Sequence, residues 1–313
     1  MPVATVVVPT YDRPVLLREA VDSALAQTVE DVEVVVVDDA SPTPVALPDH
    51  PRLRVVRLER NGGGAAARNA GLAEARGRWI TYLDDDDLLR PAHLEVALAG
   101  LEACDLPEPV AALTGTAVIS ADGELVENRL PPTFARGAHF SLEPRQPGRA
   151  LATKATLVVE AEVLRAIGGW DPAFRSRVHT ELFLRLNPAC SLLGIPIVTY
   201  DHRSHRGERV SDDPDRRLES MLRLLDKHHD AFAAHPRRHA ELAFHQAVHL
   251  WQGGRPRAAL SMWGRSLRAH PLTGGRHTAL AARDRAAHAW GGLGRRRRVP
   301  SQDTPRPREH APS

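Results

Sequence analysis

Four consecutive aspartates, Asp84 to Asp87, are the residues of this sequence best suited to chemistry. Two unit charges about 4 Å apart repel each other by about 4 kcal/mol at an effective dielectric constant of about 20. The preceding residues, Trp79–Leu83, read as an apolar strand, and a fold tolerates four carboxylates after a strand mainly where a cation lies beside them. Carboxylate oxygens suit Mg²⁺ or Mn²⁺, and Mg²⁺ usually also binds substrate phosphate oxygens. The run therefore predicts a divalent cation that carries a phosphorylated substrate, with a solvated acidic turn as the alternative.

Two further polar clusters follow segments that read as buried strands. Thr10–Asp12 follows Val3–Pro9, and Asp38–Ser41 follows the valine-rich segment Val32–Val37. Valine-rich runs are typical of strands in parallel sheets, which are covered on both faces. Ligands of open parallel sheets bind at the carboxyl ends of the strands. We therefore expect both clusters to lie beside the four aspartates, at one edge of a sheet.

The elements that must position these clusters alternate along the first hundred residues. The expected strands are Val3–Pro9, Val32–Val37, Arg54–Leu58 and Trp79–Leu83, and the expected helices are Pro14–Gln27, Ala65–Ala75 and Pro91–Glu102. This alternation predicts an α/β fold, in which a mostly parallel sheet with right-handed crossovers is flanked by helices.

The rest of the chain changes from a mixed pattern to a helical one. The mixed part contains the expected strands Val110–Ser120, Gly123–Glu127, Leu157–Val159 and Ile197–Tyr200, the expected helices Ala161–Ile167 and Thr180–Leu186, and a Pro- and Gly-rich loop, Pro131–Arg149. The helical part contains Arg217–His229, Arg238–Gln252 and Arg257–Ala269. We therefore expect a first domain at residues 1–214, a basic helical extension at 215–291 and a disordered Arg- and Pro-rich tail at 292–313.

Charge is distributed unevenly between the two parts. Residues 216–313 contain 19 Lys and Arg but only 7 Asp and Glu, although the whole chain has a net charge of only +2. A basic surface suggests an anionic partner, and Arg295–Arg298 could contact anionic lipid at about 1 kcal/mol per residue. The alternative is an ordinary solvated helical surface in a chain that favours arginine. We expect possible peripheral contact with a membrane and no nucleic acid partner.

The expected location is the cytoplasm, with possible attachment to the inner face of the membrane. No apolar run approaches the roughly 18 residues that span a bilayer. The sequence enters a strand at Val3 without the features of a secretory signal peptide. Two cysteines, Cys104 and Cys190, indicate a reducing compartment more than a disulfide scaffold.

The clusters occur in an order that resembles a known family. Val6–Pro14, Val35–Ser41, Asn61–Gly71 and Leu83–Asp87 together resemble the family 2 glycosyltransferases, which are inverting enzymes of the GT-A fold. The resemblance covers about residues 3–210. It implies a Rossmann-like GT-A domain for nucleotide-diphosphate sugars, with Mn²⁺ or Mg²⁺ as cofactor. It also implies transfer of the sugar to a hydroxyl group of an acceptor.

The resemblance assigns donor-binding roles residue by residue. Pro9, Thr10 and Tyr11 would border the nucleotide base, and Asp38 or Asp39 would accept a hydrogen bond from it. The remaining residues that bind the nucleotide sugar would be Arg68, at the base or diphosphate, Asp84, at the ribose, and Asp85. The family's base site suggests a UDP or dTDP sugar. The acceptor could be a glycan, a lipid-linked molecule or a small molecule.

The resemblance also implies the metal ligands. Asp84 and Asp86 match the Asp-x-Asp element of the family, with Asp86 binding the metal and Asp87 supporting it. A late Arg-x-His element implies that His205 completes the metal shell; an exposed loop histidine is the alternative.

The catalytic base departs from the family pattern. When the segment Val178–Leu186 is aligned on its terminal Arg-Leu, the usual aspartate falls on His179 and a second acidic position falls on Glu181. A neutral imidazole with a pKa of about 6.5 can accept a proton at neutral pH. Three readings stay open: His179 is the base, Glu181 takes the role, or the base is missing.

Two other functions compete with transfer. A catalytically weak or inactive transferase-like binding module would explain His179 in place of a carboxylate. A sugar-nucleotide pyrophosphorylase of related fold usually has a Gly-rich signature with Arg and Lys after the first strand. Thr10–Pro14 stands there instead, which argues against that enzyme.

Overall fold

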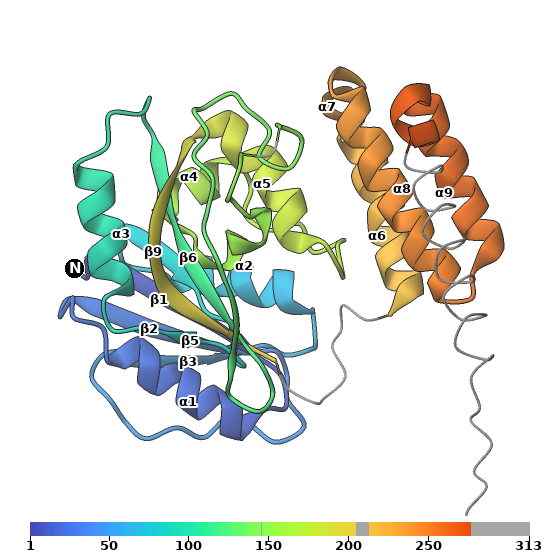
Figure 1. The fold of residues 1–313 in the computed structure, drawn as a ribbon. Coiled ribbons are helices and arrows are strands. Elements are labelled where there is room, and N and C mark those ends of the chain that lie inside the picture. The colour runs from blue at the N-terminus through green and yellow to red at the C-terminus, as the bar shows by residue number, and fades with distance from the viewer. Residues whose placement is uncertain (145, 205–212, 277–313) are drawn as a thin grey trace, which may run out of the picture.

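The computed structural model describes residues 1–144, 146–204 and 213–276 (Figure 1). It contains a curved sheet with helices on both faces, followed by the helices α6 to α9. The expected tail at 292–313 lies outside the described residues.

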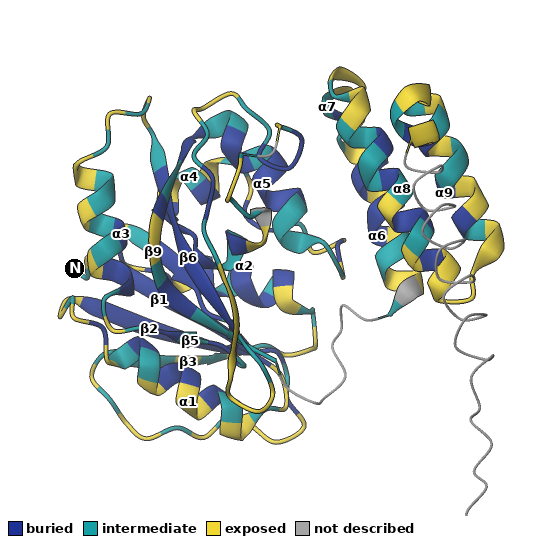
Figure 2. Ribbon diagram, in the orientation of Figure 1, coloured by how far each residue is buried: buried dark blue, intermediate teal, exposed yellow. Residues whose placement is uncertain are grey.

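The first part of the sheet is parallel and deeply buried. Its strands are β1 (Ala4–Thr10), β2 (Val32–Asp38), β3 (Leu53–Arg57) and β4 (Trp79–Tyr82), in the spatial order β3-β2-β1-β4. Every residue of β1 and β2 is buried, as the dark ribbon of Figure 2 shows. Thr10 is paired with Asp38 in the register, so two of the polar clusters leave neighbouring strands at the same edge. These strands and their parallel arrangement agree with the sequence-based prediction.

Helices cover the two faces of the parallel strands. They are α1 (Pro14–Leu25), α2 (Gly64–Glu74) and α3 (His93–Glu102). One apolar cluster joins Val6 and Val8 to α1 and α3, and another joins Val7 to α2. Alternate residues of a strand point to opposite faces, which is why neighbouring valines belong to different clusters.

The second part of the sheet is mixed. It contains β5 (Leu88–Leu89), β6 (Val110–Ile119), β7 (Leu125–Arg129), β8 (Val158–Glu160) and β9 (Ser191–Arg203). β6 and β9 pair in parallel, whereas β4 with β8, β8 with β6, β9 with β5 and β6 with β7 are antiparallel. β9 begins six residues before the expected strand Ile197–Tyr200. The β6–β9 register shifts between Leu113 and Thr116, and such an irregularity accommodates Pro196 within a strand.

Short helices complete this first unit. They are a 3₁₀ helix η1 (Leu151–Thr156), α4 (Ala161–Ala166) and α5 (Val178–Ala189). α5 is longer than the expected helix Thr180–Leu186 and begins immediately before His179. The two-residue strand β5 and η1 were not predicted, because neither is long enough to show a periodic pattern.

The helical extension consists of α6 (Pro214–Lys227), α7 (His229–Ala234), α8 (Pro236–Gln252) and α9 (Pro256–Ala269). The expected single helix Arg217–His229 is interrupted at His228, which separates α6 from α7. The extension shares an apolar cluster with the first unit, in which Phe174 and Leu184 pack with Met221 and Leu224. The helices therefore pack on α5, and the division at residue 214 stays a prediction.

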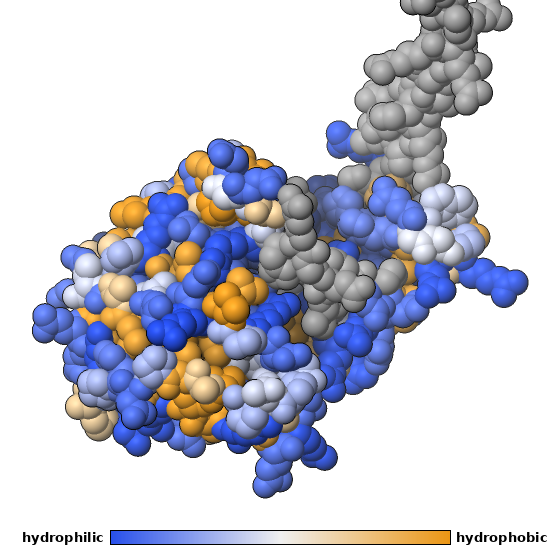
Figure 3. Space-filling view, turned by 90° about the horizontal axis from the view of Figure 1, so that it is seen from below, coloured by the Kyte–Doolittle hydropathy of each residue, from blue (hydrophilic) through white to orange (hydrophobic). Residues whose placement is uncertain are grey.

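None of the helices in the described part of the chain is long and apolar enough to cross a membrane. On the face seen in Figure 3, hydrophobic side chains are interspersed among hydrophilic ones.

Candidate functional site

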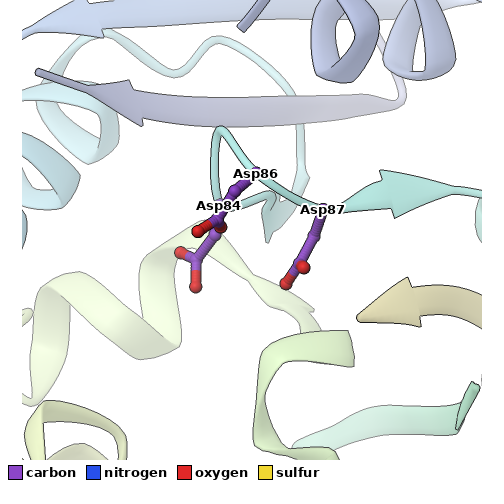
Figure 4. Close-up of side chains that lie close together, drawn as sticks. All are labelled: Asp84, Asp86 and Asp87. Atoms are coloured by element: carbon purple, nitrogen blue, oxygen red, sulfur yellow. The ribbon is translucent and has the colours of Figure 1, made fainter. Parts of the chain in front are cut away.

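The loop between β4 and β5 gathers three of the four aspartates. Asp84, Asp86 and Asp87 each place a carboxylate oxygen within 4.8 Å of the others. Figure 4 shows the three side chains leaving the loop towards the same side. These are hard oxygen ligands at a spacing that one small divalent cation could bridge. The donor set therefore fits the predicted Mg²⁺ or Mn²⁺.

Asp87 is the most firmly held of the three. Its carboxylate accepts hydrogen bonds from the Tyr200 hydroxyl (2.8 Å) and the Arg203 backbone N–H (2.9 Å), and lies 3.0 Å from His202 Nδ1. Burial raises the pKa of Asp87, against the effect of His202 and together with the repulsion of Asp84 and Asp86. Asp87 thus anchors the loop to β9, and a cation would relieve the repulsion within the cluster.

Asp85 points to the end of β1 instead. It accepts a hydrogen bond from Thr10 Oγ1 (2.7 Å) and lies 3.1 Å from the Arg13 guanidinium. The same guanidinium nitrogen lies 2.8 Å from Asp86. Burial raises the pKa of Asp85 despite these contacts. The structure therefore brings the predicted donor residues Thr10 and Asp85 together, and Arg13, which the sequence analysis did not single out, links Asp85 to Asp86.

Arg68 connects the aspartates to a stack of rings. It is 7% exposed on α2, forms an ion pair with Asp84, and places its guanidinium carbon 5.0 Å from the centroid of the Trp170 ring. Trp170 in turn contacts the His179 ring edge to face at 5.0 Å. Burial acts to raise the pKa of Asp84, but the positive charge of Arg68 outweighs burial, so the pKa lies below its ordinary value. Arg68 and Trp170 therefore place His179 near the aspartates.

His179 is neutral at physiological pH in this environment. Burial and the positive charges of Arg68 and Lys154 lower its pKa to about 3, against the opposing effect of Asp84. A neutral imidazole can accept a proton, although a depressed pKa makes it a weaker base. The ring lies on the first turn of α5, so the helix fixes its position.

Glu181 lies only two residues further but has different surroundings. It is 1% exposed, pairs with Arg185 (2.6 Å) and with Lys227 of α6 (2.7 Å), and lies 3.3 Å from His228. Burial favours its neutral form, but the hydrogen bonds from Arg185, His228 and Lys227 prevail and hold its pKa well below the usual range. A carboxylate saturated by cations is a poor proton acceptor. The geometry favours a role for Glu181 in attaching the extension to α5.

Asp38 shapes the loop that follows β2. Its carboxylate accepts hydrogen bonds from the backbone N–H of Ser41 (2.8 Å) and Val45 (3.3 Å) and pairs with Arg57. Burial would raise its pKa, but the bonds from Ser41 outweigh burial and lower it.

Asp39 shapes the glycine-rich loop before α2. It accepts hydrogen bonds from the backbone N–H groups of Gly62 and Gly63, both at 2.7 Å. Gly63 has a φ of +81°, which favours glycine. A cavity of about 630 Å³ opens beside this loop, and its lining includes Arg60, Asn61, Gly62, Pro172 and Arg175. That volume is typical of small-ligand pockets, which is consistent with a nucleotide site here.

The remaining predicted residues border this edge of the sheet. Pro9 is buried at the end of β1, and Tyr11 is 46% exposed just beyond it. His205, the predicted metal ligand, lies outside the described residues.

Sequence analysis missed Tyr200 and His202 as partners of the acidic run. They alternate on β9 and both reach Asp87. The signal was present in the sequence as period-two spacing, but the strand was expected to end at Tyr200.

Comparisons with known proteins agree on the kind of domain. Residues 5–135 match the family model described as Glycosyl transferase family 2. Succinoglycan biosynthesis protein ExoO of Rhizobium meliloti is 43% identical over 127 residues, covering 39% of this chain and 36% of that protein. The pre-mycofactocin glycosyltransferase of Mycobacterium tuberculosis is 31% identical over 215 residues, covering 64% of this chain and 43% of that protein. The chain thus matches less than half the length of these relatives.

A solved structure shows the same fold. S. aureus TarS 1–349, in complex with UDP-GlcNAc, has a TM-score of 0.61 at 20% sequence identity and covers 86% of this chain and 81% of that one. At this identity the likeness concerns the fold alone. Because residues 1–214 are only about two thirds of the chain, the matched region includes part of the helical extension. The predicted GT-A fold with a C-terminal helical extension is confirmed.

Proposed function

Because residues 5–135 match the model of glycosyl transferase family 2, we propose that the chain is a glycosyltransferase of this family and moves a sugar from a nucleotide-diphosphate sugar to an acceptor hydroxyl. One displacement would invert the anomeric centre. The observation that carries this proposal is the juxtaposition of Asp84, Asp86 and Asp87 with Arg68 and the neutral His179.

The donor would bind at the carboxyl ends of β1, β2 and β4. Asp86, with Asp84, would hold Mn²⁺ or Mg²⁺, and Asp87 would keep the loop in place from β9. The ion would stabilise the negative charge that develops on the diphosphate leaving group. Thr10 and Tyr11 lie where they could border the base, next to the loop that Asp39 organises.

A UDP or dTDP sugar is the proposed donor. The UDP-GlcNAc in the TarS complex supports a uridine nucleotide, since that protein shares the fold. Asp38 and Asp39 are the proposed base-recognition residues, although their carboxylates also accept internal bonds.

The acceptor hydroxyl would lose its proton to His179. The ring is neutral, half-buried and held against Trp170 near Asp84, so it meets the geometric need for a base better than Glu181 does. Glu181 is the second candidate, and its ion pairs with Arg185 and Lys227 argue against it.

For the location, we propose the cytoplasm, with peripheral contact at the inner face of the membrane through the basic C-terminal region. The excess of arginine in residues 216–313 supports this proposal. It would suit a lipid-linked acceptor. Deleting residues 292–313 should then weaken binding to anionic vesicles at low salt; unchanged binding would contradict the contact.

Calorimetric titration of UDP and dTDP, each with Mn²⁺, Mg²⁺ or EDTA, tests the donor site. We expect one nucleotide to bind only with a divalent ion. Metal-independent binding, or no binding of either nucleotide, would contradict the proposed site. Binding without turnover across a broad panel of acceptors would favour the inactive binding module instead.

A further inference from the structure

A group of cations beside the proposed base has no acidic partner among the residues that the structure describes. Lys154, on η1, places its ammonium 3.3 Å from Thr180 Oγ1 and 5.5 Å from the centroid of the Phe140 ring. Within the described part of the chain, no carboxylate lies within ion-pair distance of Lys154. Burial, together with the positive charges of Arg177 and Arg238, lowers its pKa to about 8.

Arg177 is held in the same group at an unusual backbone position. It precedes α5 with a φ of +59°, a left-handed conformation that is uncommon for a residue with a side chain. One guanidinium nitrogen donates to Gln246 of α8 (2.7 Å), while Nε is buried without a hydrogen-bond partner among the described residues. Burial and the nearby Arg217 lower its pKa to about 10.

Other cations in the neighbourhood are compensated. Lys227 and Arg185 both pair with Glu181, and Arg238 pairs with Glu241. In the described residues neither Arg177 nor Arg217 has a carboxylate within ion-pair distance. A partly buried cation without a counter-charge is unfavourable, because desolvation is not offset by an ion pair. The arrangement thus favours binding of an anion.

The position of the group relates it to the reaction. Lys154 contacts Thr180, the residue after His179, and its charge acts on His179. Asp84 and Arg68 flank the proposed donor site, whereas Lys154 and Arg177 lie towards the helical extension. An anion held by Lys154 and Arg177 would therefore lie close to the hydroxyl that His179 deprotonates.

We propose that Lys154 and Arg177, assisted by Arg217, form a subsite for a phosphate group carried by the acceptor. A phosphate offers the charge and the several acceptor oxygens that an ammonium and two guanidinium groups can bind. The subsite selects anionic acceptors and places their hydroxyl group at His179. This inference rests on the proposed transferase function.

Inorganic phosphate is the probe for this subsite. Thermal unfolding of the full chain is followed at rising phosphate concentration and constant ionic strength, with UDP and Mg²⁺ present to fill the donor site. We expect phosphate to raise Tm more than chloride does. In Lys154→Met and Arg177→Gln, the half-saturating phosphate concentration should rise at least tenfold.

The matched control is Arg257→Gln, an exposed cation on α9. It should respond to phosphate as the unaltered protein does. The subsite is refuted if phosphate gives no more stabilisation than chloride, if UDP and Mg²⁺ abolish the phosphate effect, or if all variants respond alike. Stabilisation by UDP and Mg²⁺, measured without phosphate, reports the donor site separately. If UDP and Mg²⁺ do not stabilise the unaltered protein, the proposed transferase function is contradicted. The phosphate titration can still be interpreted separately in that case.

Discussion

The two ends of the proposed reaction site have opposite charge imbalances. At the end of β4, Asp84, Asp86 and Asp87 crowd together, and burial and mutual repulsion raise the pKa of Asp87. Near α5, Lys154 and Arg177 lie together without carboxylate partners in the described residues, and their pKa values are lowered. The first region therefore favours a cation and the second an anion.

Glu181, in contrast, is a buried charge whose counter-charges the protein itself supplies. It is buried like Asp87, but it pairs with Arg185 and Lys227, and its pKa is lowered instead of raised. Burial alone therefore does not mark a ligand site. The informative feature is whether the protein itself supplies the opposite charge.

The strongest test removes a metal ligand from the acidic side. Asp86→Ala should abolish metal-dependent nucleotide binding and reduce turnover by about a thousandfold or more, because a bound cation contributes several kcal/mol to charge stabilisation. Calorimetry with UDP and Mn²⁺ measures the binding. Asp49→Asn, an exposed aspartate, is the control. If Asp86→Ala still binds UDP with Mn²⁺ as tightly as the unaltered protein does, the acidic region does not bind the cation through Asp86.

The next test asks whether Glu181 is structural. Glu181→Gln should lower the free energy of unfolding by about 3–5 kcal/mol, since it leaves Arg185 and Lys227 without their shared counter-charge. Denaturant unfolding measures this loss. A variant of normal stability that lacks only turnover would instead support Glu181 as the base.

The pH dependence of stability sharpens the same point. Because folding lowers the pKa of Glu181, its contribution is complete above the unfolded value of about 4.3 and is lost as the pH falls towards the folded value. The unaltered protein should therefore lose stability on acidification below about pH 5 more steeply than Glu181→Gln does. Parallel stability curves for the two proteins would contradict this assignment.

A third test separates the base from the donor site. His179→Ala should reduce kcat by about a hundredfold or more, as expected for loss of general base catalysis. Nucleotide and Mg²⁺ binding should persist, since Asp86 and Thr10 are unchanged. If His179→Ala and the unaltered protein turn over at the same rate, a group other than His179 accepts the proton.

The smallest effect concerns the basic side. Without added phosphate, Lys154→Met should raise the free energy of unfolding by about 1 kcal/mol, because an apolar side chain of similar length replaces an uncompensated charge over Phe140. Denaturant unfolding in a phosphate-free buffer measures the gain. A clear loss of stability would mean that the Lys154 ammonium already lies in a favourable environment. The basic region would then not have the uncompensated charge that the comparison with the acidic cluster requires.

The sequence alone determined the parallel strands and the position of the acidic run. The valine-rich strands, Pro14 at the start of α1 and the glycines before α2 are local signals, and local signals fix where a strand or helix begins. Since parallel strands end at one edge of the sheet, the neighbourhood of Thr10, Asp38 and the aspartates followed as well.

Only the tertiary structure decided how each charge is used. Asp87 is held by Tyr200 and His202 from a strand more than a hundred residues away, and Glu181 is neutralised by Lys227 of the helical extension. Lys154, from η1, receives no such partner in the described residues. Periodicity and spacing show which face of a helix or strand is apolar. They do not show whether a side chain distant in the sequence will form an ion pair with a given charge.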